Sequence, residues 1–198
     1  MVTKRHFALS DIPLKKDEIF YVLGYQDNNV PESVEYVLDE LLLEAPDKFD
    51  IQAGYVIHGV DEINQDRKTI RIKDTIFDVG PTLFAHFKKA EKFGFFVGTA
   101  GIGAEKWSVR YMSGSDPLKG LLIDTLGSFL VEQAVESITK EIQEITISQG
   151  LNMSNRFSPG YCKWGLDENA KIFSFFPNNF CGISLNESRK NFIRNFST

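Results

Sequence analysis

The stretch from Asp116 to Ser148 is the feature that most restricts how this chain can fold. Asp116 is a residue type that caps helix N-termini, and Pro117 follows it at the first helical position, where proline is tolerated. We therefore predict one long helix over about 117–148, which forms the spine of the fold. The residues at helical spacing that mark its buried stripe are Leu118, Leu121, Leu122, Thr125, Leu126, Phe129, Ala134, Ile138, Ile142 and Ile145.

The segment before this helix predicts several strands and two further helices. Ile51–Val60 is rich in β-branched and aromatic residues, Thr69–Ile72 alternates apolar and polar side chains, and Thr75–Val79 adds a third short stretch. Together they predict a small antiparallel sheet. An amphipathic helix is expected after Pro31, and another over Thr82–Phe93.

These elements place the chain in the α+β class, with a bent, mainly antiparallel sheet flanked by helices and by the long helix. A chain of 198 residues is long enough to bury a sizeable core. We expect a single domain over 1–198, with an N-terminal helical segment, residues 1–46, packed on it.

The charge distribution argues against a nucleic-acid partner. The formal charge is −5, whereas the part from Arg156 to Thr198 carries six basic and three acidic residues. A basic end on an acidic protein is a modest indication of anionic partners. No run approaches the roughly 20 apolar residues that span a bilayer, and Met1–His6 lacks the apolar segment of a signal peptide. We expect a cytoplasmic protein without a membrane partner.

The residues that most often carry catalysis or bind metals are few and scattered. His6, His58 and His86 fall in separate elements, so a hydrolytic triad is not expected. Cys162 and Cys181 cannot form a zinc site alone and are expected to be reduced thiols, with a redox or cobalt-facing role for Cys162 as the alternative. No catalytic residue and no metal site are predicted.

A glycine-rich loop, Gly98–Gly103, follows a short strand at Phe95–Val97. Its spacing is not that of the G-x-G-x-x-G phosphate loop, and no acidic residue follows at the end of a second strand of a βαβ unit. Two interpretations remain open, a nucleotide-phosphate loop and a tight strand-to-helix turn.

The run Arg156-Phe157-Ser158-Pro159-Gly160-Tyr161 predicts a type II turn over its last four residues, because proline presets φ at the second position and glycine accepts positive φ at the third. Such a turn directs backbone N–H groups outward. The arginine before it and the aromatic residues Tyr161 and Trp164 add a cation and flat apolar surfaces. This set suits a small ligand that carries a carboxylate and an aromatic base, although a purely structural turn is the alternative.

A second polar feature lies on the long helix. Asp124, Ser128, Glu132 and Glu136 are spaced by four residues and share one helix face. Glu132 and Glu136 repel each other unless a cation or solvent lies nearby. The face is therefore either a solvated acidic surface or part of a site for a positively charged group.

The turn and the segment that follows it resemble the activation domain of vitamin B12-dependent methionine synthase. In that family Arg-x-[Ala/Ser]-Pro-Gly-Tyr is the signature of the S-adenosylmethionine site, and a Gly-[Ile/Met]-x-Leu-Thr-Glu-Ser run follows it. The corresponding residues are Arg156–Tyr161 and Gly182–Ser188. The resemblance implies a stand-alone module that binds S-adenosylmethionine and supports reductive methylation of cob(II)alamin, as a component of methionine synthase activity and not a self-sufficient enzyme.

The resemblance also implies roles for individual residues. Arg156 would pair with the carboxylate of S-adenosylmethionine, and Glu132 aligns with a glutamate that contacts this ligand in the family. The backbone at Ser158 and Gly160 would bind the adenine, and Tyr161 would lie between the ligand and the corrin. Cobalamin would be carried by a corrinoid-binding methionine synthase chain or corrinoid protein, and a flavodoxin-like protein would donate the electron.

The sequence departs from the family pattern near its end. Asn186 replaces the usual threonine, and Arg189–Thr198 lacks the Pro and Ser-x-Ser-Gly segment that follows in the family. A second hypothesis is therefore a non-catalytic interaction protein of the same fold that has lost ligand binding. A third is a free-standing methyltransferase that acts on a small molecule.

Overall fold

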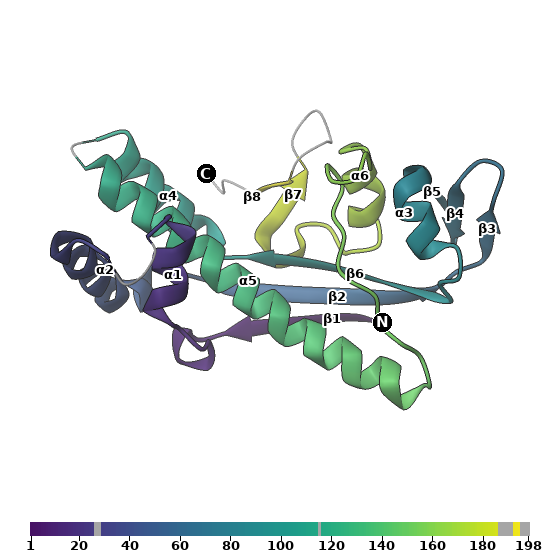
Figure 1. Cartoon of the computed structure of the whole chain (residues 1–198), viewed down its shortest axis with the longest axis horizontal. Helices are drawn as coiled ribbons and strands as arrows, with labels where there is room; N and C mark the ends of the chain where they lie inside the picture. Colours follow the sequence, from purple (N-terminus) through teal and green to yellow (C-terminus); the bar gives the residue numbers. More distant parts are fainter. Residues whose placement is uncertain (26–28, 115, 186–191, 195–198) are drawn as a thin grey trace. The chain divides into compact units, whose positions relative to one another are not determined.

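The computed structural model describes residues 1–25, 29–114, 116–185 and 192–194 (Figure 1). The predicted family residues Asn186, Glu187 and Ser188 lie outside the described residues. The chain divides into two compact units. Unit 1 comprises Met1–Thr3, Tyr55–Phe96 and Thr139–Asn195, and unit 2 comprises mainly Lys4–Gly54 and Val97–Ile138. The α+β class is confirmed, whereas the prediction of a single domain stays a prediction.

Four elements contribute residues to both units: strands β1 (Val2–Phe7), β2 (Ile51–Gly59) and β6 (Lys92–Thr99), and helix α5 (Pro117–Ser148). The three strands form one sheet in the order β1-β2-β6. The predicted long helix is confirmed with both of its bounds. Its start has the expected cap, because the Asp116 carboxylate accepts a hydrogen bond of 3.0 Å from the Lys119 N–H, the third residue of the helix.

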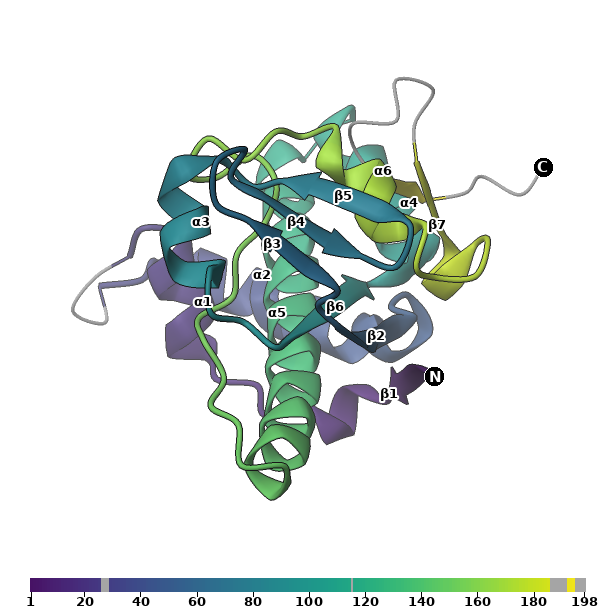
Figure 2. The same ribbon diagram turned by 90° about the vertical axis from the view of Figure 1, so that its right-hand side faces the viewer.

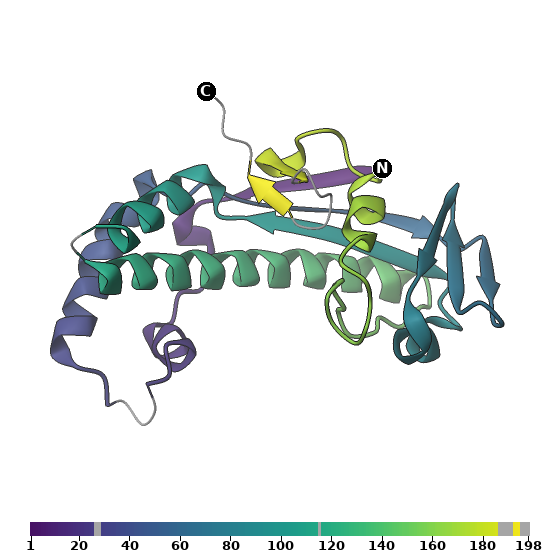
Figure 3. The same cartoon turned by 90° about the horizontal axis from the view of Figure 1, so that it is seen from above.

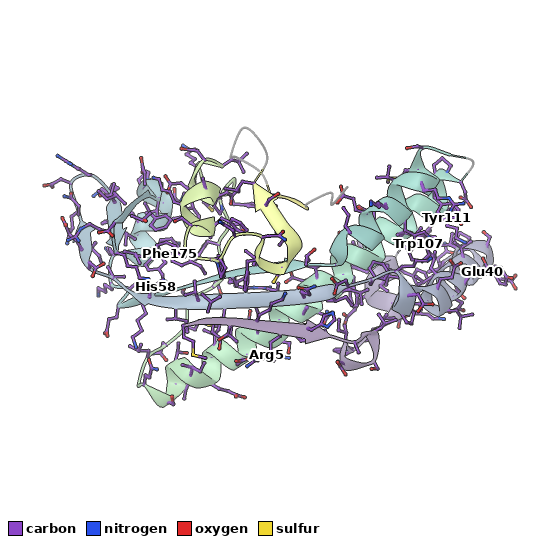
Figure 4. All side chains as sticks on the ribbon, turned by 180° about the vertical axis from the view of Figure 1, so that it is seen from behind. Arg5, Glu40, His58, Trp107, Tyr111 and Phe175 are labelled. Carbon is purple, nitrogen blue, oxygen red and sulfur yellow. The ribbon has the colours of Figure 1, made fainter. Side chains whose placement is uncertain are left out.

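Unit 2 is mainly helical. It contains α1 (Lys16–Val22), α2 (Glu32–Glu44), α4 (Gly101–Met112), two 3-10 turns (Leu9–Asp11 and Ala45–Asp47) and the first part of α5. Leu38, Leu41, Leu122, Leu126 and Leu130 are fully buried and form much of its core. Figure 3 shows α4 beside the first turns of α5, and Trp107 and Tyr111 lie one turn apart on α4 (Figure 4). The predicted helix after Pro31 is α2.

Helices α4 and α5 approach closely because Gly120 has no side chain. A Cβ atom at Gly120 would lie 2.6 Å from both the backbone nitrogen and Cγ of Met112. The buried Ser108 hydroxyl also donates a 3.0 Å hydrogen bond to the Gly120 carbonyl. This contact fixes the α4–α5 hairpin.

Unit 1 is built around a small antiparallel sheet of β3 (Glu62–Asn64), β4 (Thr69–Ile72) and β5 (Thr75–Asp78). Figure 2 shows helix α3 (Gly80–Phe87) at the left of this sheet and helix α6 (Glu168–Phe173) behind β5. After a 3-10 turn (Phe180–Gly182), β7 (Ile183–Leu185) pairs antiparallel with β8 (Phe192–Arg194). Of the three stretches predicted to form one antiparallel sheet, Thr69–Ile72 and Thr75–Val79 do pair as β4 and β5, whereas Ile51–Val60 corresponds to β2 and pairs in the other sheet.

The core of unit 1 is aromatic. Phe95 stacks on Phe77 at 5.4 Å and on Phe175 at 4.9 Å between ring centroids. Phe87 meets Trp164 edge-on at 6.4 Å. Such ring pairs contribute about 0.5–1.5 kcal/mol each beyond the area they bury. These five rings come from segments far apart in the sequence, so the core forms only when the unit closes.

The predicted helix over Thr82–Phe93 is wrong in its second half, because α3 ends at Phe87 and β6 begins at Lys92. Phe93 and Phe95 follow the two-residue period of a strand and stack at 6.2 Å, and Phe93 also meets Phe87 edge-on at 5.0 Å. The aromatic contacts of unit 1 therefore override the helical spacing of residues 88–93.

Candidate functional site

The turn of the predicted signature has the expected geometry. The Tyr161 N–H donates a 3.2 Å hydrogen bond to the Ser158 carbonyl, and Gly160 has φ = +97°. These values, with Pro159 at the second position, define the type II turn. A Cβ atom at Gly160 would also lie 2.9 Å from Cδ2 of Leu166, so backbone conformation and space both favour glycine.

A second turn follows at once and was not predicted. Cys162 and Lys163 have φ of 51° and 65°, and the Trp164 N–H donates to the Tyr161 carbonyl at 2.8 Å. Positive φ at two non-glycine residues is strained, at about 1–2 kcal/mol per residue. The Gly160 N–H donates to the Trp164 carbonyl at 2.8 Å, which closes the double turn and places Trp164 in the core. No glycine or asparagine marked this turn in the sequence.

The structure brings four of the five predicted site residues into one short stretch of unit 1. Arg156, Ser158 and Gly160 are exposed, and the Tyr161 side chain is 72% exposed. Glu132 is exposed on the part of α5 that belongs to unit 2, on one face with the exposed Asp124 and Ser128. The pairing of Glu132 and Arg156 around one ligand stays a prediction.

A cavity of about 700 Å³ lies within unit 1, beside the signature turn. Most of its lining comes from the end of α3 with the segment to Glu91, the first half of β6, the last turns of α5 and the irregular segment 150–159. Ile57 of β2, Trp164 and two residues of α6 complete it. Figure 1 shows the irregular segment running from the end of α5 toward α6. Buried apolar side chains of the cavity wall include Phe87, Phe95, Ile142, Trp164 and Ile172.

The charged side chains that line the cavity are mostly positive. Lys89, Lys92 and Arg156 contribute positive charges to its lining, and among the described residues Glu91 is the one carboxylate there. The Trp164 indole is 6% exposed, and its Nε1 has no hydrogen-bond partner among the described residues. The sequence indicates Trp164 only as a flat apolar surface. A buried indole donor cannot be located from sequence, because its burial depends on the double turn.

His58 is a packed residue of β2, as its place in a strand predicted. Its ring lies 4.9 Å from that of Phe175, and Figure 4 shows the two side chains next to each other. Its Nε2 is buried and has no hydrogen-bond partner among the residues that the structure describes. Burial, and secondarily the charge of Lys73, lowers the pKa of His58, so the fold favours the neutral imidazole.

Acidification is therefore expected to destabilise the protein through His58. Because the folded-state pKa lies below the unfolded value of about 6.5, the unfolded state binds the proton more readily, and stability is lost as pH falls through that value. We expect urea unfolding at pH 5.5 to show a smaller loss, relative to pH 7.5, in His58→Phe than in the wild type. Equal losses in both proteins would contradict this assignment.

The glycine-rich loop of unit 2 is a tight strand-to-helix connection. Gly101 has φ = +82°, and a Cβ atom there would lie 2.7 Å from Cβ of Asp50. A Cβ atom at Gly103 would lie 2.5 Å from the Lys48 carbonyl oxygen. The space that a phosphate loop leaves for its ligand is filled by residues 48–50, so the second of the two interpretations is supported.

Metal sites, disulfides and membrane-spanning helices are not found among the described residues. Within the described ranges, no group of three or more His, Cys, Asp or Glu side chains is arranged to hold a metal ion. Cys162 is exposed and Cys181 is buried, and neither forms a disulfide. None of the described helices combines the length and the apolar character needed to cross a membrane.

Comparisons with known proteins support the fold. No protein-family model matches the chain, and neither does any curated protein. Among solved structures, the chain is similar to the MetH reactivation domain bound to AdoHcy, with a TM-score of 0.64 and 16% identity. The match covers 95% of this chain and 74% of that one. The chain therefore has a reactivation-type α+β fold, which agrees at the level of fold with the resemblance found in the sequence.

Proposed function

We propose that this chain binds S-adenosylmethionine at the signature turn, residues 156–161, and acts as a reactivation module for a cobalamin-dependent methionine synthase or a related corrinoid methyltransferase. The observation that carries the proposal is the turn itself. The residues that resemble the family signature form a type II turn with an exposed arginine and tyrosine, within a fold similar to a reactivation domain that was solved with AdoHcy.

The hydrogen bonds of the double turn indicate which backbone groups remain for adenine. The N–H groups of Gly160 and Tyr161 are engaged, with the carbonyls of Trp164 and Ser158. The Ser158 N–H and the Gly160 carbonyl have no backbone partner among the described residues. One donor and one acceptor match adenine, which presents an acceptor ring nitrogen beside its N6 amino group. This arrangement fits the adenine role predicted for Ser158 and Gly160.

The resemblance assigns the charged parts of the ligand to two side chains, Arg156 and Glu132, and this pairing stays a prediction. Arg156 offers a planar guanidinium for the carboxylate, and such charge-assisted bonds are stronger than neutral ones. Glu132 would face the ammonium or sulfonium charge. Tyr161, 72% exposed on a rigid turn, offers a flat ring for stacking against the ligand or a corrin.

In this proposal the chain contributes position and electrostatics and no general acid or base. A cobalamin held by a partner would supply the reaction chemistry: the bound S-adenosylmethionine would give its methyl group to it and remain as AdoHcy, with one electron provided by a flavodoxin-like donor. The residues of the turn hold the ligand with its methyl group open to the partner. If the turn does not bind S-adenosylmethionine, the remaining hypothesis is a non-catalytic interaction protein of the same fold.

Arg156→Ala is expected to weaken binding of S-adenosylmethionine about 10- to 100-fold, since a hydrogen bond to a charged group contributes about 1.5–3 kcal/mol. Isothermal titration calorimetry with S-adenosylmethionine and with AdoHcy measures this loss. Arg67→Ala is the matched control, because it removes the same charge from an exposed position elsewhere in unit 1. Equal affinity of Arg156→Ala and the wild type, or the absence of binding to the wild type, would overturn the proposal.

A further inference from the structure

We propose that Phe87 is a positioning residue for the signature turn: its ring, which contacts both Phe157 and Trp164, holds residues 156–161 in the conformation that binds S-adenosylmethionine. The inference rests on the proposed function, because it concerns the same turn. Phe87 is the last residue of α3 and is 7% exposed. It acts through its two neighbours, and the role requires no contact between Phe87 and the ligand.

The turn needs support from outside because its second half is strained. Cys162 and Lys163 have φ of 51° and 65°, which L-residues with a full side chain seldom adopt. Strained backbone persists only where the surrounding structure determines it. The hydrogen bond from the Gly160 N–H to the Trp164 carbonyl closes the double turn, but both groups belong to the turn itself. Contacts with another element are therefore needed to fix its position.

Phe87 supplies such contacts on both flanks of the turn. Its ring meets that of Phe157, the residue after Arg156, at 5.3 Å between centroids and an interplanar angle of 83°. It meets the indole of Trp164, which follows the strained pair, at 6.4 Å and 72°. Both are edge-on arrangements, which aromatic rings favour. One buried ring thus joins the residue before Ser158 to the residue that closes the double turn.

The rest of α3 also lies beside the turn. At its start, a Cβ atom at Gly80 would lie 3.7 Å from the carbonyl oxygen of Lys163. Near its end, the His86 ring lies 5.5 Å from the ring of Phe157. The helix therefore forms a platform for the turn, and Phe87 reaches both flanks from it.

This support affects affinity through preorganisation. A turn that already has its binding conformation avoids the cost of ordering when the ligand arrives. The apparent dissociation constant rises in inverse proportion to the fraction of molecules whose site is competent. If loss of the Phe87 ring lowers that fraction to about one tenth, binding weakens about tenfold.

Phe87→Leu is therefore expected to weaken AdoHcy binding about tenfold, measured by calorimetry on the whole chain well below the unfolding midpoint. Phe77→Leu is the matched control, because Phe77 is also buried and stacks in the same core, on Phe95 and Phe175, without lining the cavity. Its affinity should stay close to that of the wild type. Wild-type affinity in Phe87→Leu, or equal losses in both variants, would overturn the inference.

Amide hydrogen exchange distinguishes positioning from a direct contact with the ligand. The N–H groups of Gly160 and Trp164 donate to the carbonyls of Trp164 and Tyr161, so their protection reports closure of the double turn. In the ligand-free protein both amides should exchange about tenfold faster in Phe87→Leu than in Phe77→Leu. Weaker AdoHcy binding without faster exchange would mean that Phe87 touches the ligand, and the positioning role would be wrong.

Phe157→Leu keeps the test valid if Phe87→Leu does not fold. It removes the same ring pair from the other side, at a residue that is only partly buried. We expect weaker AdoHcy binding and faster exchange of the same two amides, and wild-type values of both would overturn the inference. In the double variant the loss of affinity should be smaller than the product of the single losses, because both changes break one contact.

The exchange rates also separate this inference from the proposed function. If the wild type does not bind AdoHcy, the proposed function fails. The ligand-free protein still shows whether Phe87 holds the turn, and equal exchange of Gly160 and Trp164 in Phe87→Leu and Phe77→Leu would overturn that role.

Discussion

Gly120→Ala is expected to lower the free energy of unfolding by about 2 kcal/mol, because overpacking against backbone costs up to about 3 kcal/mol and the gain in helix propensity returns about 1 kcal/mol. The added Cβ would lie 2.6 Å from the Met112 nitrogen and 3.0 Å from its Cα. Backbone atoms cannot move aside as a side chain can. The α4–α5 hairpin must therefore open, and the Ser108 hydrogen bond to the Gly120 carbonyl is lost with it.

Urea unfolding followed by circular dichroism measures this effect. Gly59→Ala serves as the control, since its Cβ would meet a single atom at 4.0 Å. We expect the control to stay within about 0.5 kcal/mol of the wild type, as for most substitutions away from special features. A Gly120→Ala protein as stable as the wild type would mean that α4 and α5 do not pack at this distance.

Lys171→Met is expected to lower the free energy of unfolding by about 2 kcal/mol. Removing one partner of a fully buried ion pair costs about 3–5 kcal/mol, and the expected loss is smaller here because the lysine is partly exposed. The Lys171 ammonium donates to Oε1 of Glu168 at 2.6 Å and to the Ile76 carbonyl at 2.8 Å. The Glu168 side chain is only 4% exposed, and its Oε2 has no partner among the described residues. Removing the lysine leaves a buried carboxylate without its cation.

The pH dependence of this variant identifies the cause. Burial raises the pKa of Glu168, and Lys171 opposes that shift. Without the lysine the pKa rises further, so the stability of the folded state is retained at low pH and lost as pH rises through the folded-state value. We therefore expect Lys171→Met to be more destabilised at pH 8 than at pH 5. The double variant Lys171→Met/Glu168→Gln should lose this pH dependence. If Lys171→Met lost the same free energy of unfolding at pH 5 and at pH 8, the ionised Glu168 carboxylate would not be the cause of the destabilisation.

Local signals in the sequence were sufficient for much of the fold. The Asp116 cap and Pro117 define the start of α5 without reference to any distant contact, and the alternation of Thr69–Ile72 defines β4. The type II turn was equally predictable, because Pro159 and Gly160 restrict their own backbone angles. Each of these features depends on a few neighbouring residues.

The features that sequence could not predict depend on distant residues. The end of α3 at Phe87 is set by aromatic contacts with Phe93, and the turn at Cys162 and Lys163 adopts strained angles that neither residue type favours. The cavity combines parts of α3, β6, α5 and segment 150–159. Its unsatisfied donor, Trp164 Nε1, is buried only because the double turn directs that ring inward.

The most direct measurement of the central proposal is a titration of the ¹⁵N-labelled protein with AdoHcy, followed by amide resonances. We expect saturable shifts concentrated at Ser158, Gly160 and Tyr161, because the backbone of the turn binds the adenine. Absence of shifts at the turn with up to millimolar ligand, or saturable shifts confined to residues other than 156–161, would contradict binding at the signature turn.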